Sequence, residues 1–364
     1  MENNPAFTLR LDGQPWTTWT DINVTRALDR ASGEFSVSFG MNRAEGSLSL
    51  DGGLRTGMTA DVEIDGQVVL SGYVRAVGYA YDAVSFGISV DGRDRAIDLL
   101  DCAAVVDGAH EFYNETLASV IAKIAKPFGI PVSVETDTGK PFTRLAVQPG
   151  ETANDFIERA CRYRGVLCVS DGIGGLVVVK PGTEKSKGIL IYGDNILSGD
   201  VRHDDSELFS VYVVKGQAEP QADDIDVAPS VSASARVSDG NVKRYRPKVI
   251  VAENQGYDLT LAERAAWEKK IASARAKKAT YSVRGWYADA AAKALWKPNT
   301  LVTVIDQRAQ LFKREMLING VSFRRSAAGT TTQLDLALPG AFDIPAEDED
   351  ASSKNGTTIW VSDE

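Results

Sequence analysis

The sequence lacks the features of a membrane-spanning or secreted protein. None of its apolar runs reaches the roughly 20 residues that a helix needs to cross a bilayer. The polar start, Met1–Pro5, is unlike a signal peptide. We therefore expect a chain that is made and folded in a cytoplasm and is not inserted into a membrane.

Cysteine and histidine are scarce, which limits disulfide and metal chemistry. The three cysteines, Cys102, Cys161 and Cys168, are odd in number and contain no Cys-x-x-Cys pair, so buried free thiols are expected. A zinc site would need four Cys or His ligands at short spacings. The two histidines, His110 and His203, do not complete such a set. No metal and no cofactor are predicted.

Recognisable catalytic motifs are also missing. The segment His203–Ser206 has the residue types of a Ser/His/Asp relay, but adjacent residues cannot form one, because the relay needs side chains that meet in space. The glycine-rich Gly172–Gly175 lacks the Lys-Ser/Thr of a phosphate loop and is interpreted as a hairpin turn. The sequence does not exclude a glycosidase site whose two carboxylates come from distant parts of the chain, although no particular residues indicate one. We expect a non-enzyme with no catalytic residue.

The chain is acidic, with a formal net charge of −10 at pH 7. A protein that grips nucleic acid normally presents a basic face, so tight nucleic-acid binding is not expected. The same charge is compatible with a surface past which DNA slides, because like charges repel.

Two stretches of the chain carry the same all-β pattern, with apolar residues at every second position. This alternation predicts strands with one buried and one wet face. The first copy has strands at Ile22–Leu28, Phe35–Phe39, Val62–Ile64, Gly72–Val77 and Phe86–Val90. The second has strands at Ile196–Val201, Phe209–Val213, Val302–Val304, Ile318–Val321 and Leu334–Leu338. Phe35, Val37 and Phe39 then align on Phe209, Val211 and Val213, and a duplicated unit suits a ring of even symmetry.

Between the two copies the spacing of apolar residues becomes helical. Helices are predicted at Glu115–Phe128, with Asn114 as N-cap, and near Ala153–Arg164. A further helix, Leu261–Ala279, begins with the capping box of Thr260 and Glu263. The predicted divisions are a first β unit at 1–99, an α+β module at 100–183, a second β unit at 184–216 and 280–340, an insertion at 217–279 and an acidic C-terminal arm at 341–364. The fold class is mainly β with an α+β module.

The most specific local signal is Val283-Arg-Gly-Trp286, followed by Ala294-Leu-Trp-Lys-Pro-Asn299, then Val302–Val304 and Asp306. Three further features accompany this signal: the pair Trp16 and Trp19, the pair Arg55 and Gly57, and the segment Ser71–Val74. From about residue 5 to 340 the chain resembles the baseplate hub proteins of contractile phage tails, the family that includes tail protein P of phage Mu. More distantly, it resembles the T-even phage hub and the front half of the type VI secretion spike protein.

The resemblance implies two tail-tube-like β-barrels per chain, the second split by an insertion that packs with the α+β module. It also implies a homotrimer whose six near-equivalent units match the hexameric tail tube, while a threefold face meets the trimeric spike. Strand edges would be paired between subunits. The other expected partners are baseplate wedge proteins, and DNA would pass through the lumen. The expected location is the tail baseplate of the virion, after assembly in the host cytoplasm.

The same resemblance nominates contact residues. Trp286, Trp296, Pro298 and Asn299 are expected to shape contacts of the second barrel between units, and Trp360 to dock on a neighbour. The alternatives are that both internal tryptophans are core residues and that the terminal one is frayed.

Two other functions remain open. One is a tail-associated peptidoglycan-binding or muralytic protein, which would need a catalytic carboxylate pair in a groove. Val147–Glu151 also resembles the opening of a peptidoglycan-binding repeat, but in the family that the chain resembles such a piece belongs to the α+β block, so glycan binding is not inferred from it. An effector-delivery protein of the secretion-spike type would need a fused C-terminal spike β-helix. The sequence alone does not separate a phage from a tailocin or a defective prophage.

Overall fold

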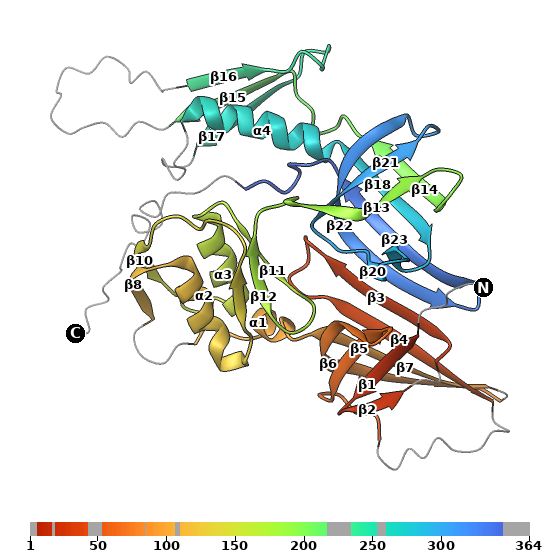
Figure 1. The fold of residues 1–364 in the computed structure, drawn as a ribbon. Coiled ribbons are helices and arrows are strands. Elements are labelled where there is room, and N and C mark those ends of the chain that lie inside the picture. The colour runs from red at the N-terminus through yellow and green to blue at the C-terminus, as the bar shows by residue number, and fades with distance from the viewer. Residues whose placement is uncertain are drawn as a thin grey trace, which may run out of the picture.

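The computed structural model describes residues 6–16, 19–42, 53–83, 85–105, 110–216, 234–252 and 260–344. Strands predominate and a few helices accompany them, so the mainly β class is confirmed (Figure 1). In the described part of the chain no helix is long and apolar enough to cross a bilayer.

Most strands belong to one large sheet. Their order is β14-β18-β23-β22-β3-β4-β7-β6-β5-β1-β2, and β21 pairs with both β22 and β13. The strands from the first part of the chain are β1 (Phe7–Leu11), β2 (Gln14–Trp16), β3 (Asp21–Ala27), β4 (Glu34–Asn42), β5 (Thr59–Ile64), β6 (Gln67–Tyr81) and β7 (Ser85–Asp94). The others are β13 (Glu184–Ile191), β14 (Ile196–His203), β18 (Lys277–Arg284), β21 (Thr300–Asp306), β22 (Leu311–Ser326) and β23 (Gly329–Ala337).

The two halves of this sheet repeat one strand order. The first half runs β3-β4-β7-β6-β5-β1 and the second runs β14-β18-β23-β22-β21-β13. Corresponding neighbours are antiparallel in both halves, except that β13 is parallel to β21 where β1 is antiparallel to β5. Both long strands, β6 and β22, also carry a bulge at the same place, at Arg75 and at Asn319. We call the two halves the first and second β units.

One strand of the expected repeat is misplaced. In the second unit β18 occupies the position of β4, so that Ala279, Tyr281 and Val283 correspond to Phe35, Val37 and Phe39. The predicted partner, Phe209–Val213, lies outside the main sheet, where β15 (Val211–Gly216) pairs with two strands of the insertion. Alternation alone could not choose between Phe209–Val213 and the segment that forms β18, since both have an apolar residue at every second position.

The two units share one continuous sheet, and no closed barrel is present in the described residues. The second half of β22 pairs with β3 beyond the point where β21 ends, so the sheet continues from the second unit into the first. The expectation of two separate closed barrels is therefore corrected. Strand patterns predict a curved sheet with a buried face, but not where its edges meet.

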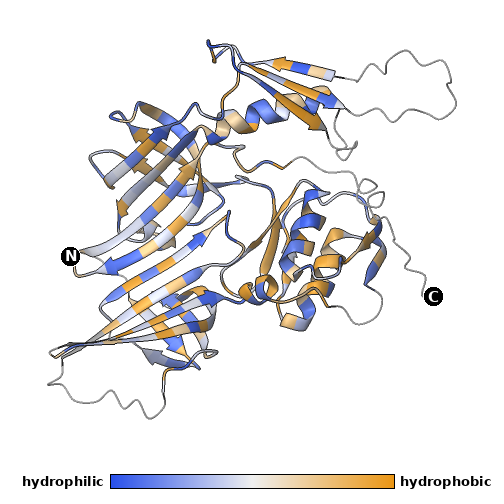
Figure 2. Cartoon of the chain, turned by 180° about the vertical axis from the view of Figure 1, so that it is seen from behind, coloured by the Kyte–Doolittle hydropathy of each residue, from blue (hydrophilic) through white to orange (hydrophobic). Residues whose placement is uncertain are grey.

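The apolar faces of both units form a single core. It joins Val37 and Leu70 of the first unit to Tyr281 and Leu334 of the second. Hydrophobic and hydrophilic residues alternate along these strands (Figure 2). One face is thus packed and the other is polar.

The α+β module lies beside the first unit (Figure 1) and has a core of its own. Its elements are α1 (Ile97–Asp101), β8 (Glu111–Glu115), α2 (Leu117–Ala125), η2 (Lys126–Phe128), β9 (Val132–Val134), β10 (Phe142–Ala146), α3 (Ala153–Arg162), β11 (Leu167–Ser170) and β12 (Leu176–Val179). The N-cap of α2 is Thr116, not the predicted Asn114, because the threonine side chain accepts a hydrogen bond from Ser119 N. Gly172 lies in the hairpin turn, as predicted, with a φ of 80°.

The insertion forms a small sheet covered by one helix. The sheet consists of β15, β16 (Ser234–Ser238) and β17 (Pro247–Ala252), and α4 (Leu261–Arg275) packs on β15 and β16. The capping box of Thr260 and Glu263 is confirmed. Packing of the insertion with the α+β module remains a prediction. A short hairpin of β19 (Tyr287–Asp289) and β20 (Ala294–Leu295) completes the second unit.

Candidate assembly site at the joint between the two β units

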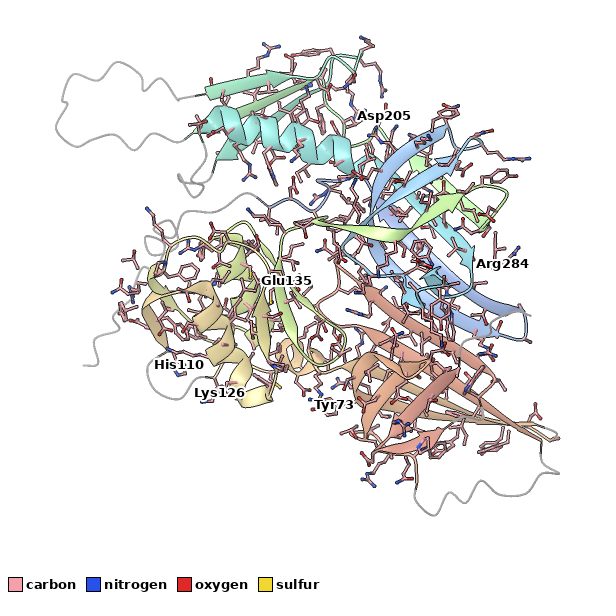
Figure 3. The ribbon with its side chains drawn as sticks, in the orientation of Figure 1. Tyr73, His110, Lys126, Glu135, Asp205 and Arg284 are labelled. Atoms are coloured by element: carbon pink, nitrogen blue, oxygen red, sulfur yellow. The ribbon has the colours of Figure 1, made fainter. Side chains whose placement is uncertain are left out.

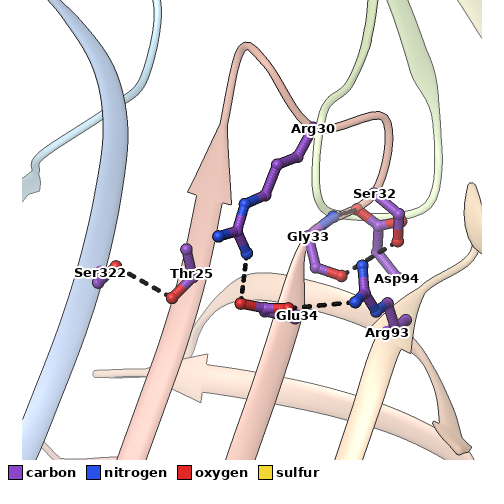
Figure 4. Close-up of polar contacts among 8 residues, drawn as sticks. All are labelled: Thr25, Arg30, Ser32, Gly33, Glu34, Arg93, Asp94 and Ser322. Carbon is purple, nitrogen blue, oxygen red and sulfur yellow. Dashed lines mark hydrogen bonds and ion pairs between the residues drawn. The ribbon is translucent and has the colours of Figure 1, made fainter. Parts of the chain in front are cut away.

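The joint is the antiparallel pairing of β22 with β3. The register places Gly320 opposite Ala27 and Arg325 opposite Ile22. On the core side Phe323 is opposite Val24, and both side chains are buried. On the other side the hydroxyls of Ser322 and Thr25 lie 3.0 Å apart and hydrogen-bond to each other (Figure 4). The joint therefore has the regular pairing and burial of an internal sheet position.

Trp286 contacts both β units within the core beneath the β22–β3 joint. Its side chain is fully buried, and its ring packs edge-on against Phe7 of the first unit and Phe323 of the second, with centroids 6.3 and 6.2 Å apart. Its Nε1 donates to the carbonyl oxygens of Arg324 and Thr331, each at 3.1 Å. Trp286 thus contributes to contact between the two units of one chain. Contact with another copy remains a prediction.

A polar contact joins the units at a second point. The Tyr287 hydroxyl donates to the Asp65 carboxylate, and Lys293 Nζ lies 3.4 Å from the same group. Gln67 also donates to the carbonyl oxygen of Lys293 at 3.3 Å. The Tyr287 hydrogen bond is the main reason that the pKa of Asp65 is lowered. Burial, reinforced by the Asp65 carboxylate, raises the pKa of Tyr287 to about 12.

The remaining expected contact residues form the approach to β21. Trp296 is buried in the core of the second unit. Asn299 follows the half-buried Pro298 and has a φ of 64°; its side chain accepts from Gly182 N at 2.8 Å and donates to Lys180 O at 3.2 Å. The Asn299 side chain thus ties the second unit to the end of the α+β module. Trp360 lies outside the described residues.

A buried carboxylate joins the first unit to the α+β module. Asp94 accepts hydrogen bonds from the Ser32 hydroxyl at 2.8 Å and from Gly33 N at 2.7 Å (Figure 4). It also accepts from the Ser170 hydroxyl at 2.7 Å and from Ala96 N at 3.1 Å. Burial raises the pKa of Asp94, and these donors oppose that shift. The buried guanidinium of Arg26 adds a positive charge nearby. Sequence reasoning missed this cluster, because its members come from four separate segments.

Three family descriptions match the chain. They are the N-terminal domain of the Mu phage baseplate assembly protein GpP-like family at residues 6–94, the second domain of baseplate hub protein gp44-like proteins at 96–180, and the fourth domain of GpP at 259–345. The baseplate hub protein gp44 of Escherichia phage Mu is 32% identical over 359 residues, which are 96% of this chain and 92% of that protein. The chain belongs to the phage Mu baseplate hub family. It is a structural component of the phage tail baseplate.

Solved structures agree with this assignment of the hub chain. The 43 kDa tail protein of prophage MuSo2 from Shewanella oneidensis is 33% identical with a TM-score of 0.81, over 93% of this chain and 99% of that one. The Escherichia coli c3393 protein, a type VI secretion component described as similar to phage T4 gp27 and gp5, has a TM-score of 0.54 at 11% identity. It is matched over 91% of this chain and 76% of that one, and the likeness concerns the fold alone.

The polar face of the hub's sheet is hollowed at the joint. A groove of about 700 Å³ crosses β3, β22, β23 and β18. Its lining includes Thr25 and Ser322 and the charged residues Arg275, Arg324 and Asp335. The Asp335 carboxylate accepts from the hydroxyl of Thr280 at 2.8 Å. Charges of both signs and hydroxyl groups thus line the groove.

The residues considered for catalysis are scattered over the hub. His110 lies on the α+β module, whereas Asp205, two residues after the other histidine, lies near the insertion (Figure 3). Asp204 accepts from Ser206 N at 2.8 Å, and Asp205 pairs with Arg244, so this segment is a polar turn. Among the described residues no group of three or more His, Cys, Asp or Glu side chains could hold a metal ion.

Proposed function

We propose that three copies of the hub chain form a ring of six similar β units that joins the hexameric tail tube to the trimeric spike. The repeated strand order supports this proposal most directly. A closed ring repeats one interface around its axis, so a threefold assembly with two like units per chain can offer six similar surfaces to a sixfold partner. The α+β module and the insertion occur once per chain and leave the opposite face threefold.

In this proposal the hub works mechanically. The continuous sheet forms a rigid wall, and its polar face lines the lumen through which DNA passes. The net charge of −10 disfavours tight binding of DNA to that wall. The spike, the tube protein and the wedge proteins are the proposed partners.

We propose no catalytic step for the hub. In the segment that resembles a peptidoglycan-binding repeat, both carboxylate oxygens of Glu151 receive hydrogen bonds from Arg159, each at 2.8 Å. Glu151 also accepts from Gln148 N at 3.0 Å. This carboxylate is engaged in holding the turn, which favours a structural role for the segment.

Mass measurement tests the proposal. Light scattering on the purified chain should give the mass of three chains, and electron microscopy of the hub mixed with tail tube protein should show trimers capping sixfold tubes. A mass of one chain at every concentration, with no association with tubes, contradicts the proposal. A zymogram with peptidoglycan should remain uncleared, and clearing would favour the muralytic alternative.

A further inference from the structure

Each β unit has a long strand whose second half extends beyond its neighbour. In the second unit, β21 covers β22 only as far as Ile318, and β3 covers the rest of that edge from Gly320 onward. In the first unit, β5 covers β6 only as far as Tyr73. No described strand pairs with the remaining edge of β6, which runs to Tyr81.

The strand that corresponds to β3 is also open on one side. β14 occupies the place of β3 in the second unit and pairs with β18 along one edge. Its other edge has no partner strand among the described residues; an isolated bridge between Tyr192 and Ile196 touches its start. The open edges of β6 and β14 lie at opposite ends of the continuous sheet (Figure 1).

From this correspondence we infer that the open half of β6 pairs antiparallel with the open edge of β14 in a second copy of the chain. The inference rests on the proposed ring and specifies its contact between subunits. The β22–β3 joint inside the chain would alternate with a β6–β14 joint between chains. Three copies would then close the ring with six similar joints and leave neither edge exposed.

Burial supports the same pairing. Tyr79 corresponds to Phe323, four positions beyond the shared bulge, yet Tyr79 is 49% exposed while Phe323 is 4% exposed. Val201 corresponds to Val24 and is only half-buried, whereas Val24 is buried. The two strands that pair inside the chain, β22 and β3, bury their apolar residues at this place. Their counterparts, β6 and β14, leave the equivalent residues accessible.

Backbone direction is consistent as well. Asp204 N donates to Ala276 O, so the even-numbered residues of β14 bond to β18 and the odd-numbered ones, including Val201, direct their N–H and C=O outward. The equivalent bond of the internal joint, from Leu28 N to Asn319 O, shows the same alternation on β3. Unpaired edge groups of this kind are a template for another strand.

The repeat also fixes the register. Residues that pair across neighbouring strands form rows in the sheet. The row that follows the bulge contains Ala76, Asp91, Ser36 and Asn23 in the first unit. The corresponding row of the second unit contains Gly320, Asp335, Thr280 and Asp200. In the internal joint Arg324 lies opposite Asn23. Ala80 corresponds to Arg324 and Asp200 to Asn23. Ala80 of one copy should therefore lie opposite Asp200 of the next, in a closely spaced pair without mutual backbone bonds.

Cysteine cross-linking tests the register. In a chain whose native Cys102, Cys161 and Cys168 are replaced, we expect the variant with Ala80→Cys and Asp200→Cys to oxidise into covalently linked trimers. Directly opposed Cα atoms in such a pair are about 4.5 Å apart, which suits a disulfide. The matched control combines Ala80→Cys with Arg202→Cys, two residues out of register on the same face. It should cross-link at least tenfold more slowly.

The outcomes separate the inference from the proposed ring. If light scattering gives trimers but the in-register pair does not cross-link, or does so no faster than the control, the edge pairing is wrong and the trimer stands. A chain that remains monomeric at every concentration overturns both.

A second variant tests the bond itself. Val201→Pro removes an outward N–H and leaves the pairing with β18 intact, since proline is tolerated on the open side of an edge strand. Circular dichroism and thermal unfolding should remain close to those of the parent chain, while the trimer dissociates at least tenfold more readily. A Val201→Pro chain that assembles as tightly as the parent contradicts the inference.

Discussion

The hydroxyl of Ser322 on β22 hydrogen-bonds to that of Thr25 on β3 at 3.0 Å, across 297 positions of sequence. The two residues face each other in the pairing that joins the second unit to the first. Ser322 is buried, and this hydrogen bond gives its hydroxyl a partner within the chain. The contact therefore reports directly on the pairing of the two units.

The coupling between these hydroxyls can be measured. Ser322→Ala should lower the free energy of unfolding by about 1 kcal/mol, because it removes one hydrogen bond and leaves the Thr25 hydroxyl unpaired. In a chain that already carries Thr25→Val, Ser322→Ala should lower the free energy of unfolding by less, since no Thr25 hydroxyl is left without a partner. Urea unfolding of the four chains gives the coupling energy. Strictly additive losses would show that the hydroxyls act independently.

Trp286 should be the most costly single truncation at the joint. Trp286→Ala removes the ring between Phe7 and Phe323 and leaves two backbone carbonyls without their indole donor. We expect a loss of about 3–5 kcal/mol in unfolding free energy, measured by chemical denaturation. Tyr245→Ala is the control: that side chain is 82% exposed, and its loss should change stability by no more than about 0.5 kcal/mol. Equal effects would contradict the role given to Trp286.

Much of the fold could be predicted from local patterns. Nine of the ten strands predicted from alternation lie in the main sheet, because a half-buried strand has a period of two wherever it occurs. The exception, Phe209–Val213, has the same period and pairs with β16 and β17 instead. Which strand pairs with which depends on contacts distant in sequence. No local pattern encodes those contacts.

Only part of the joint between the units could be predicted from the sequence. The family resemblance nominated Trp286, which lies in the core where the two units meet; its expected contact with another copy stays a prediction. Its partner Phe7 carried a signal too, as the first apolar residue of the alternating Phe7–Leu11 strand. Asp94 carried no local sequence signal, because its hydrogen-bond donors come from separate segments that meet only in the folded chain.

Alkaline pH should loosen the polar contact between the units. The pKa of Tyr287 is raised to about 12, so the neutral phenol is favoured in the folded chain. The stability that this group contributes is fully present below its ordinary pKa of about 10 and is lost as the pH rises through 12. The difference in unfolding free energy between the parent chain and Tyr287→Phe should therefore shrink from pH 9 to 12. A constant difference over that range would contradict the coupling to Asp65.

The Glu151–Arg159 pair should matter far more than exposed ion pairs of the same module. Both side chains are nearly buried, at 9% and 12% exposure, and the guanidinium also donates to Ala146 O. Arg159→Met leaves the carboxylate buried without its partner, so we expect a loss of about 3–5 kcal/mol in unfolding free energy.

Arg144→Met is the matched control for this variant, because Arg144 pairs with Glu111 at the surface. It should cost less than about 1 kcal/mol. Denaturant titration of the two variants measures both losses. Adding Glu151→Gln to Arg159→Met should restore part of the stability, since the uncompensated charge is removed. If the double variant were less stable than Arg159→Met alone, the burial of an unpaired charge could not be the cause of the loss.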